Sequence, residues 1–353
     1  MGREETLRSL DNQTLDRASR PFGICPNDLK MVPDYEGCAN LVFEYECDGQ
    51  SRILRISVDS RRTAEWIQAE LHFVTYLSEH GVRVSTPVMS EMGRLIESLR
   101  VGGQLLHVVS FVKGKGVRVP DNDYRYREDA PIEEYFQNWG RMLGRMHAVV
   151  RDYRPISEQL KRPEWFELHR DRLAIVPRLS GESSALQRRV HALLDEIRSL
   201  PRSVESHGLI HGDFNDGNFT VDYANGDFTV FDFDDCCYYF WFMHELAAAW
   251  EGGIGRVMFR GLKERTDFMK HYMDQVMEGY TLEHALSEEW LARLPLFVKL
   301  IHVEEFLHYA EHPSESDAMM QRQQGYRIRC IEDDIPYMGF FDDLYCPDRP
   351  FSL

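Results

Sequence analysis

Residues 209–235 restrict the possible folds of this chain more than any other stretch, because they place carboxylates beside strand-like segments. Five of its Asp form two clusters, which are Asp213 and Asp216, then Asp232, Asp234 and Asp235. Asn225-Gly226 between the strand-like segments predicts a tight hairpin, which would bring Asp213 and Asn218 to face Asp232. Gathered carboxylates repel one another and lose solvation. The stretch therefore predicts a divalent cation such as Mg²⁺, which prefers oxygen ligands.

The first third of the chain predicts a small sheet with one helix. Strand-like segments occur at residues 29–33, 40–46, 51–58, 93–101 and 104–112. Asp48-Gly49 is a strong hairpin signal between the second and third of these strands. Residues 61–81 keep apolar side chains at helical spacing, and Gly81 predicts the end of that helix. We expect about five strands, with the helix after the third.

The remaining residues predict a second, mostly helical lobe. Residues 112–131 are polar and contain Gly and Pro, as expected of a linker or hinge. Helices are predicted at 132–150 and 183–200, and again beyond residue 240. A chain of 353 residues is long for one domain. We therefore divide it into lobes at residues 1–112 and 113–353, with a ligand expected in the cleft between them.

The sequence "HGDFNDGN", followed after the hairpin by "FDFDD", has the form H-G-D-x-x-x-x-N and then an Asp-led segment. This pattern resembles the aminoglycoside phosphotransferase and choline kinase superfamily, relatives of the protein kinases. By this resemblance, Asp213 is the catalytic base that takes the proton of the substrate hydroxyl, and Asn218 and Asp232 hold Mg²⁺ on the nucleotide phosphates. The loop is braced by His211, and Asp234 supports the site or contacts substrate.

The same resemblance implies an α+β, protein-kinase-like bilobal fold, with a small antiparallel-sheet lobe and a larger mostly helical lobe. It implies an ATP site in which Arg55 contacts the phosphates and pairs with Glu70, although the family usually has Lys at the position of Arg55. Backbone groups near Ser110 to Val112 are expected to contact adenine. The phosphate-covering loop at residues 34–43 contains one Gly and resembles the family only loosely.

Composition excludes some partners and favours one compartment. The formal net charge is −17, from 58 acidic and 41 basic residues, so a duplex nucleic acid is not expected as a partner. No apolar run approaches the ~20 residues of a membrane helix. Seven Cys without paired zinc-type spacing predict reduced thiols in a cytoplasmic protein. The sequence does not determine the oligomeric state.

The phosphate acceptor is the least determined part of the site. The five consecutive aromatic residues 238–242 predict a packing seam, or else part of a substrate pocket that stacks on a cation. Glu304 and Glu305 predict an amine site or a solvated helix face, and Asp216 is expected to be solvated or to cap a turn. We therefore expect a small hydroxyl-bearing substrate that also carries an amine, such as an aminoglycoside, an amino alcohol or homoserine.

Three classes of function stay open at this level. The first is a small-molecule kinase that uses ATP or GTP, and the second is a bacterial Ser/Thr protein kinase of the same fold. The third is a nucleotide-binding module without turnover, or a metal-dependent hydrolase. A hydrolase would not need the Arg55–Glu70 pair, and a module without turnover would more often lack Asp213 or Asp232.

Overall fold

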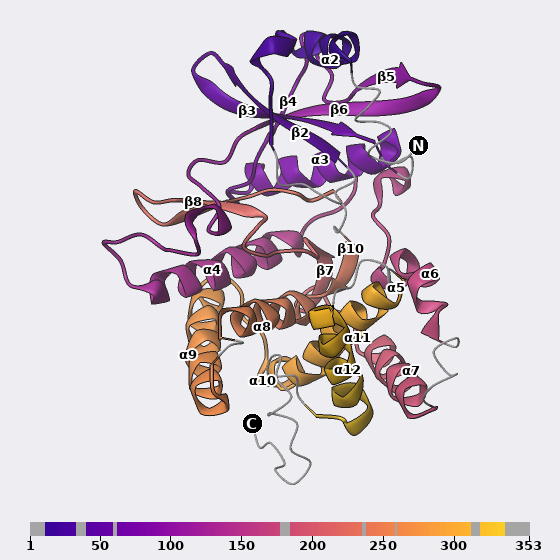
Figure 1. The fold of residues 1–353 in the computed structure, drawn as a ribbon, viewed down its shortest axis with the longest axis vertical. Coiled ribbons are helices and arrows are strands. Elements are labelled where there is room, and N and C mark those ends of the chain that lie inside the picture. Colours follow the sequence, from indigo (N-terminus) through magenta and orange to yellow (C-terminus); the bar gives the residue numbers. More distant parts are fainter. Residues whose placement is uncertain are drawn as a thin grey trace.

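The computed structural model describes residues 11–32, 40–58, 62–176, 184–234, 238–257, 260–311 and 318–335. Figure 1 shows a small lobe built on a sheet, above a larger lobe built mostly of helices. This is the α+β, bilobal architecture that the sequence predicts. The last strand of the sheet ends at Val112, and the division of the chain at that residue stays a prediction.

The small lobe is built on one six-stranded antiparallel sheet. Its strands have the order β1-β2-β3-β6-β4, and β5 also pairs with β6. Their bounds are Lys30–Met31 (β1), Asn40–Cys47 (β2), Gln50–Ser57 (β3), Pro87–Val88 (β4), Glu97–Val101 (β5) and Gln104–Val112 (β6). Asp48 and Gly49 have φ of 52° and 74°, as a two-residue hairpin of type I′ requires. The sequence predicts five strands, and it misses β4 because two residues are too few for a periodic pattern.

Helix α3 (Ala64–Glu79) lies beneath the sheet and above the large lobe (Figure 1). It begins where the hydroxyl of Thr63 accepts a hydrogen bond from the N–H of Trp66 at 3.2 Å. On one side, Ile67 and Leu71 pack with Val109 and Phe111 of β6. On the other side, buried residues that include Phe73, Val74 and Leu77 pack with the core of the large lobe. The helix therefore couples the two lobes.

The chain also contains an N-terminal helix that the sequence analysis does not predict. Helix α2 (Asn12–Ser19) begins at Asp11, whose side chain accepts a hydrogen bond from the N–H of Thr14 at 2.8 Å. Within this helix, only Ala18 and the partly buried Leu15 pack into the apolar core of the small lobe. So sparse an apolar stripe gives little periodic signal.

The segment predicted as a linker or hinge, residues 112–131, begins at the last residue of β6 and is bonded to the large lobe. The segment includes the short helix η3 (Pro120–Asn122). The backbone of Val117 exchanges two hydrogen bonds with Val221, at 3.1 and 2.8 Å. Gly116 has φ of 95°, and a Cβ there would lie 1.8 Å from the carbonyl oxygen of Val221. Only glycine therefore permits this close approach.

Within the described residues, the large lobe consists of helices around two two-stranded sheets, β7 (His207–Ile210) with β10 (Tyr238–Trp241) and β8 (Phe219–Asp222) with β9 (Asp227–Val230). The long helices are α4 (Ile132–Val150), α7 (Ser184–Ser199), α8 (Met243–Val257), α9 (Leu262–Thr281), α11 (Leu294–Glu311) and α12 (Ala318–Asp333). The short helices are η1 (Arg20–Phe22) and η2 (Pro26–Asp28) in the small lobe, and η4 (Glu158–Leu160), α5 (Trp165–Leu168), α6 (Arg170–Leu173) and α10 (Glu288–Leu291) in the large lobe. A break separates α10 from α11. Pro295 has no N–H to donate to the carbonyl oxygen of Leu291, so one continuous helix cannot form across this point.

The aromatic run at residues 238–242 belongs to the core. Strand β10 (Tyr238–Trp241) pairs with β7 (His207–Ile210), and both lie in the large lobe (Figure 1). The exposed fractions of Phe240, Trp241 and Phe242 are 1% or less. The packing interpretation of this run is therefore confirmed.

None of the helices in the described residues is long and apolar enough to cross a membrane.

Candidate active site

The predicted hairpin is present and places Asn218 beside the residue that precedes Asp232. Strands β8 (Phe219–Asp222) and β9 (Asp227–Val230) pair with Phe219 opposite Val230. Beyond the pair, the N–H of Phe231 donates to the carbonyl oxygen of Asn218 at 2.9 Å. The Asn218 amide nitrogen donates to the Asp213 carboxylate at 2.9 Å and to its carbonyl oxygen at 2.8 Å. Asp213 and Asn218 are thus hydrogen-bonded, and Asp232 directly follows Phe231, which is bonded to the backbone of Asn218.

His211 ties the loop of residues 211–218 to the segment after β9. Its Nε2 donates to the carbonyl oxygen of Phe231 at 3.0 Å, and its Nδ1 accepts from the N–H of Asp213 at 3.3 Å. Both ring nitrogens therefore contact backbone, and the side chain is buried. This geometry matches the bracing role expected of His211 and leaves no ring nitrogen for a substrate.

Glu245 at the start of α8 supports the same loop from below. Its carboxylate accepts a hydrogen bond from the N–H of Gly212 at 3.0 Å and from His147 Nε2 at 2.6 Å. Burial raises the pKa of Glu245, but these hydrogen bonds outweigh burial and the net shift is downward. His147 and Glu245 are 98 residues apart, so no local sequence pattern signals their contact.

Arg55 and Glu70 form the predicted ion pair. Arg55 on β3 donates to both carboxylate oxygens of Glu70 on α3, at 2.8 and 2.7 Å. Both side chains are buried. Burial acts to lower the pKa of Arg55, but Glu70 and then Asp234 raise it overall, so the guanidinium stays charged. The bidentate geometry suits Arg better than Lys, which explains why this site tolerates the departure from the family's usual residue.

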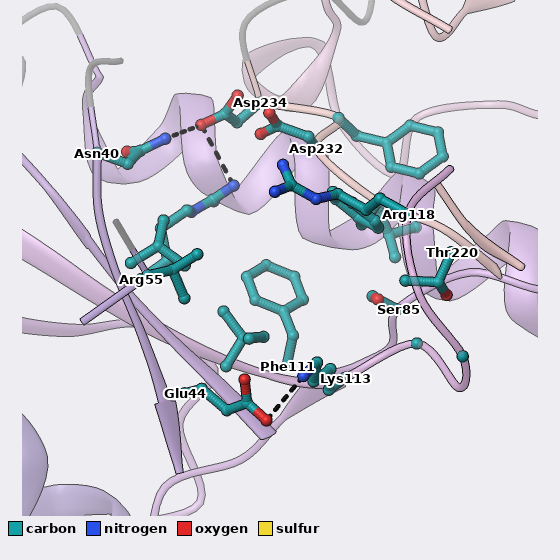
Figure 2. A pocket seen from close by; sticks show the side chains of 18 of the residues that line it. Asn40, Glu44, Arg55, Ser85, Phe111, Lys113, Arg118, Thr220, Asp232 and Asp234 are labelled. Atoms are coloured by element: carbon teal, nitrogen blue, oxygen red, sulfur yellow. Dashed lines mark hydrogen bonds and ion pairs between the residues drawn. The ribbon is translucent and has the colours of Figure 1, made fainter. Parts of the chain in front are cut away.

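Asp234 lies at the centre of a polar network between the lobes. Its carboxylate lies 3.3 Å from Arg55 Nη1 and accepts a hydrogen bond from Asn40 Nδ2 (Figure 2). The same carboxylate also pairs with Arg62. Burial raises the pKa of Asp234, but Arg55 and Arg62 lower it to about 2. The site therefore positions Asp234 as a support for Arg55 rather than as an exposed contact for a substrate. Asp235 lies outside the described residues.

Asp232 has the properties of a carboxylate that meets a cation. Its φ of 67° is a left-handed conformation, which costs about 1–2 kcal/mol for a residue other than glycine. Burial, and then the Asp234 carboxylate, raise its pKa well above the ordinary value. Within the described ranges, no group of three or more His, Cys, Asp or Glu could hold a metal ion. Asp232 and Asn218 with substrate phosphates would supply the oxygen ligands that Mg²⁺ usually takes.

A cavity of about 260 Å³ lies between the sheet and the β8–β9 hairpin. Figure 2 shows Asp232, Asp234 and Arg55 at one end, with the Glu44–Lys113 ion pair, 2.7 Å long, at the other. Its apolar walls come from Val42, Ile53, Val74, Phe111 and Phe231. A slot with apolar walls and a charged end is suited to a planar base joined to phosphates.

Ser110 and Val112 are not among the residues that line this cavity. Ser110 is fully buried, and its hydroxyl lies 2.6 Å from that of Tyr45. The N–H of Val112 donates to the carbonyl oxygen of Thr86. The alternation of strand β6 turns Phe111 and Lys113 into the cavity instead. Of the predicted phosphate-covering loop, residues 34–39 lie outside the described residues.

Two carboxylates of the large lobe are bound to other side chains and are not solvated, contrary to one of the alternatives predicted for each. Asp216 is not solvated, because it accepts hydrogen bonds from Arg256 at 2.8 Å and from Tyr135. Burial raises the pKa of Asp216, and Arg256 partly offsets this rise. Glu304 does not present a carboxylate to an amine, because it binds Trp165 Nε1 at 2.6 Å and His244 Nε2 at 2.9 Å. Both partners come from distant parts of the chain, where no local pattern signals them.

Comparisons with known proteins agree with this geometry. The model of the phosphotransferase enzyme family matches residues 31–281. The amicoumacin kinase of Bacillus subtilis (strain 168) is 28% identical over 299 residues, which cover 83% of this chain and 83% of that protein.

Solved structures show the same likeness over the whole chain. An amicoumacin kinase in complex with AMP-PNP, Ca²⁺ and Ami superposes with a TM-score of 0.79, at 25% identity, over 98% of this chain and 100% of that one. A microcompartment-associated aminopropanol kinase gives a TM-score of 0.63 at 22% identity, over 92% of this chain and 94% of that one. These matches confirm the expected protein-kinase-like fold.

Proposed function

The chain belongs to the phosphotransferase enzyme family and is a kinase that acts on hydroxyl groups, and from this premise we propose that it transfers the γ-phosphate of ATP to a small, amine-bearing molecule. The observation that carries this proposal is the likeness to amicoumacin kinase over 98% of the chain. Amicoumacin is therefore the first acceptor to test. A net charge of −17 also favours a cationic acceptor.

Asp213 acts as the general base in this proposal. Its carboxylate is exposed and accepts hydrogen bonds from the amide nitrogens of Asn215 and Asn218, each at 2.9 Å. These bonds orient the carboxylate. From this position Asp213 takes the proton of the acceptor hydroxyl, a contribution of typically 10²–10⁴-fold in rate.

Arg55 holds the phosphates and is itself held by Glu70 and Asp234. Asn218 and Asp232 would act on the phosphates through Mg²⁺, which they would hold and which neutralises phosphate charge when bound. The relative solved with AMP-PNP and Ca²⁺ supports the use of a nucleotide with a divalent cation. The apolar walls beside Phe111 receive the base. Positioning and charge neutralisation supply most of the catalysis in such reactions.

The proposal is tested by incubating the purified protein with Mg²⁺ and ATP or GTP, and with each of a panel of acceptors. The panel contains amicoumacin, homoserine, aminopropanol, aminoglycosides and a mixture of proteins. We expect amicoumacin to gain one phosphoryl group, seen by mass spectrometry and by ³¹P NMR. Asp213→Asn should abolish transfer while nucleotide affinity is retained, and Asp227→Asn on the adjacent β8–β9 hairpin should have no effect. Transfer only to protein would support a protein kinase instead.

A further inference from the structure

The buried side chain of Arg162 has no place in the chemistry described so far. It lies just after η4 in the large lobe, and its exposed fraction is 2%. Its Nη1 donates to the carbonyl oxygen of Trp66 on α3 at 3.3 Å, and its Nη2 donates to the carbonyl oxygen of Asp234 at 3.2 Å. One guanidinium therefore joins α3 to the segment that carries Asp232.

Trp66 completes this junction. The guanidinium carbon of Arg162 lies 3.7 Å from the ring centroid of Trp66, within the range of a cation–π interaction. The indole N–H of Trp66 donates to the same carbonyl oxygen of Asp234, at 3.1 Å. We call Arg162, Trp66 and the Asp234 carbonyl the interlobe clamp. Its three members come from three separate segments of the chain, so it holds them in one fixed relation.

The interlobe clamp acts on the groups that hold phosphate. Trp66 and Glu70 are four residues apart on α3, so they lie on the same face of that helix. Glu70 makes both short bonds to Arg55, and Asp234 lies two residues after Asp232. Whatever fixes Trp66 against Asp234 therefore also fixes Arg55 relative to Asp232.

The segment that carries Arg162 is itself anchored in the large lobe. The carbonyl oxygen of Pro163 accepts a hydrogen bond from the N–H of Tyr239 on β10 at 2.9 Å. Burial of a guanidinium is costly, and an apolar side chain would fill the same space at lower cost. The use of Arg at this position is therefore better explained by its directional contacts than by packing alone.

We propose that Arg162 is a positioning residue, which through the interlobe clamp keeps α3 docked on the Asp232–Asp234 segment before any nucleotide binds. This inference rests on the proposed function, because the interlobe clamp is taken to hold Arg55 in position for the nucleotide phosphates. A preformed site avoids the cost of ordering these groups when the nucleotide binds. Loss of the clamp should then loosen α3 and weaken binding of nucleotide phosphates, while binding of the acceptor stays unchanged.

The test compares Arg162→Met with Arg162→Lys and with a matched control, Arg293→Met. Arg293 also stacks on a tryptophan, with its guanidinium carbon 4.4 Å from the ring of Trp290, but it belongs to neither α3 nor the Asp232 segment. Hydrogen exchange of the amides in residues 64–79 is measured on the nucleotide-free protein. We expect exchange about tenfold faster in Arg162→Met, an intermediate rate in Arg162→Lys, and the wild-type rate in Arg293→Met.

A second measurement separates this inference from the proposed function. In Arg162→Met, the KM for ATP should rise about tenfold, a loss of about 1.4 kcal/mol, with the KM for the acceptor unchanged. Equal exchange in α3 for wild type and Arg162→Met would overturn the clamp even in an active enzyme. Faster exchange spread evenly over the whole chain would overturn it too, since that indicates general destabilisation.

If Arg162→Met does not fold, Trp66→Phe removes the indole donor alone and should shift both measurements in the same direction by less. If the wild-type protein binds no nucleotide, the proposed function fails, while the exchange data still test the clamp.

Discussion

Removal of the Glu70 carboxylate should reveal how strongly the buried ion pair couples the sheet to α3. The exposed fraction is 5% for Arg55 and 1% for Glu70, so Glu70→Ala leaves a guanidinium that water cannot reach. Breaking a buried pair from one side typically costs 3–5 kcal/mol. Asp234 stays 3.3 Å from Arg55 and compensates part of the charge. We therefore expect a loss near the lower limit, about 3 kcal/mol in the free energy of unfolding.

Urea denaturation followed by circular dichroism measures this loss. The control is Glu289→Ala, which removes an exposed partner of Arg293 and should cost less than about 0.5 kcal/mol. The double variant Arg55→Met with Glu70→Leu leaves no unpaired charge, and Asp234 keeps Arg62 as its partner. It should therefore be destabilised by less than Arg55→Met alone or Glu70→Leu alone, but it should lose affinity for ATP. If Glu70→Ala costs under 1 kcal/mol, or the double variant costs the sum of the single ones, the ion pair is not coupled as argued.

Three further outcomes are expected. In urea denaturation, Gly116→Ala should lower the free energy of unfolding by several times the ~1 kcal/mol that Gly103→Ala costs. Both glycines have positive φ, but of the two only Gly116 would place a Cβ against backbone atoms, and equal costs would contradict this packing. Burial, and then His147, lower the pKa of His284 to about 4, so the folded state binds fewer protons than the unfolded state below the ordinary pKa of ~6.5. The free energy of unfolding should therefore fall as the pH drops from about 6.5 toward 4. A His284→Gln variant with the same pH slope would refute this assignment. Saturating Mg²⁺ and ATP at ~100 times the dissociation constant should add about 2.7 kcal/mol to the free energy of unfolding, and EDTA or Asp232→Ala should remove this gain. A gain that survives EDTA would contradict a metal requirement, and a gain that survives Asp232→Ala would exclude Asp232 from the site.

The sequence alone was sufficient for features that depend on near neighbours. The hairpin of β8 and β9 follows from Asn225-Gly226, and the bounds of α4 follow from an apolar stripe that repeats at helical spacing. Asp213, Asn218 and Asp232 are predicted to lie near one another for the same reason, since one short hairpin lies between them. The pairing of Arg55 with Glu70 came from the resemblance, and a strand followed at once by a helix makes it geometrically simple.

The tertiary structure alone decided which polar groups are buried against one another. Asp216 reads as a solvated loop residue in the sequence, but Arg256 reaches it from α8, 40 residues further on. Trp66 and Asp234 are 168 residues apart, and nothing local to either signals their contact. Side-chain periodicity and turn chemistry act over a few residues. Contacts between distant segments depend on how whole elements pack, so these partners emerge only when the lobes are assembled.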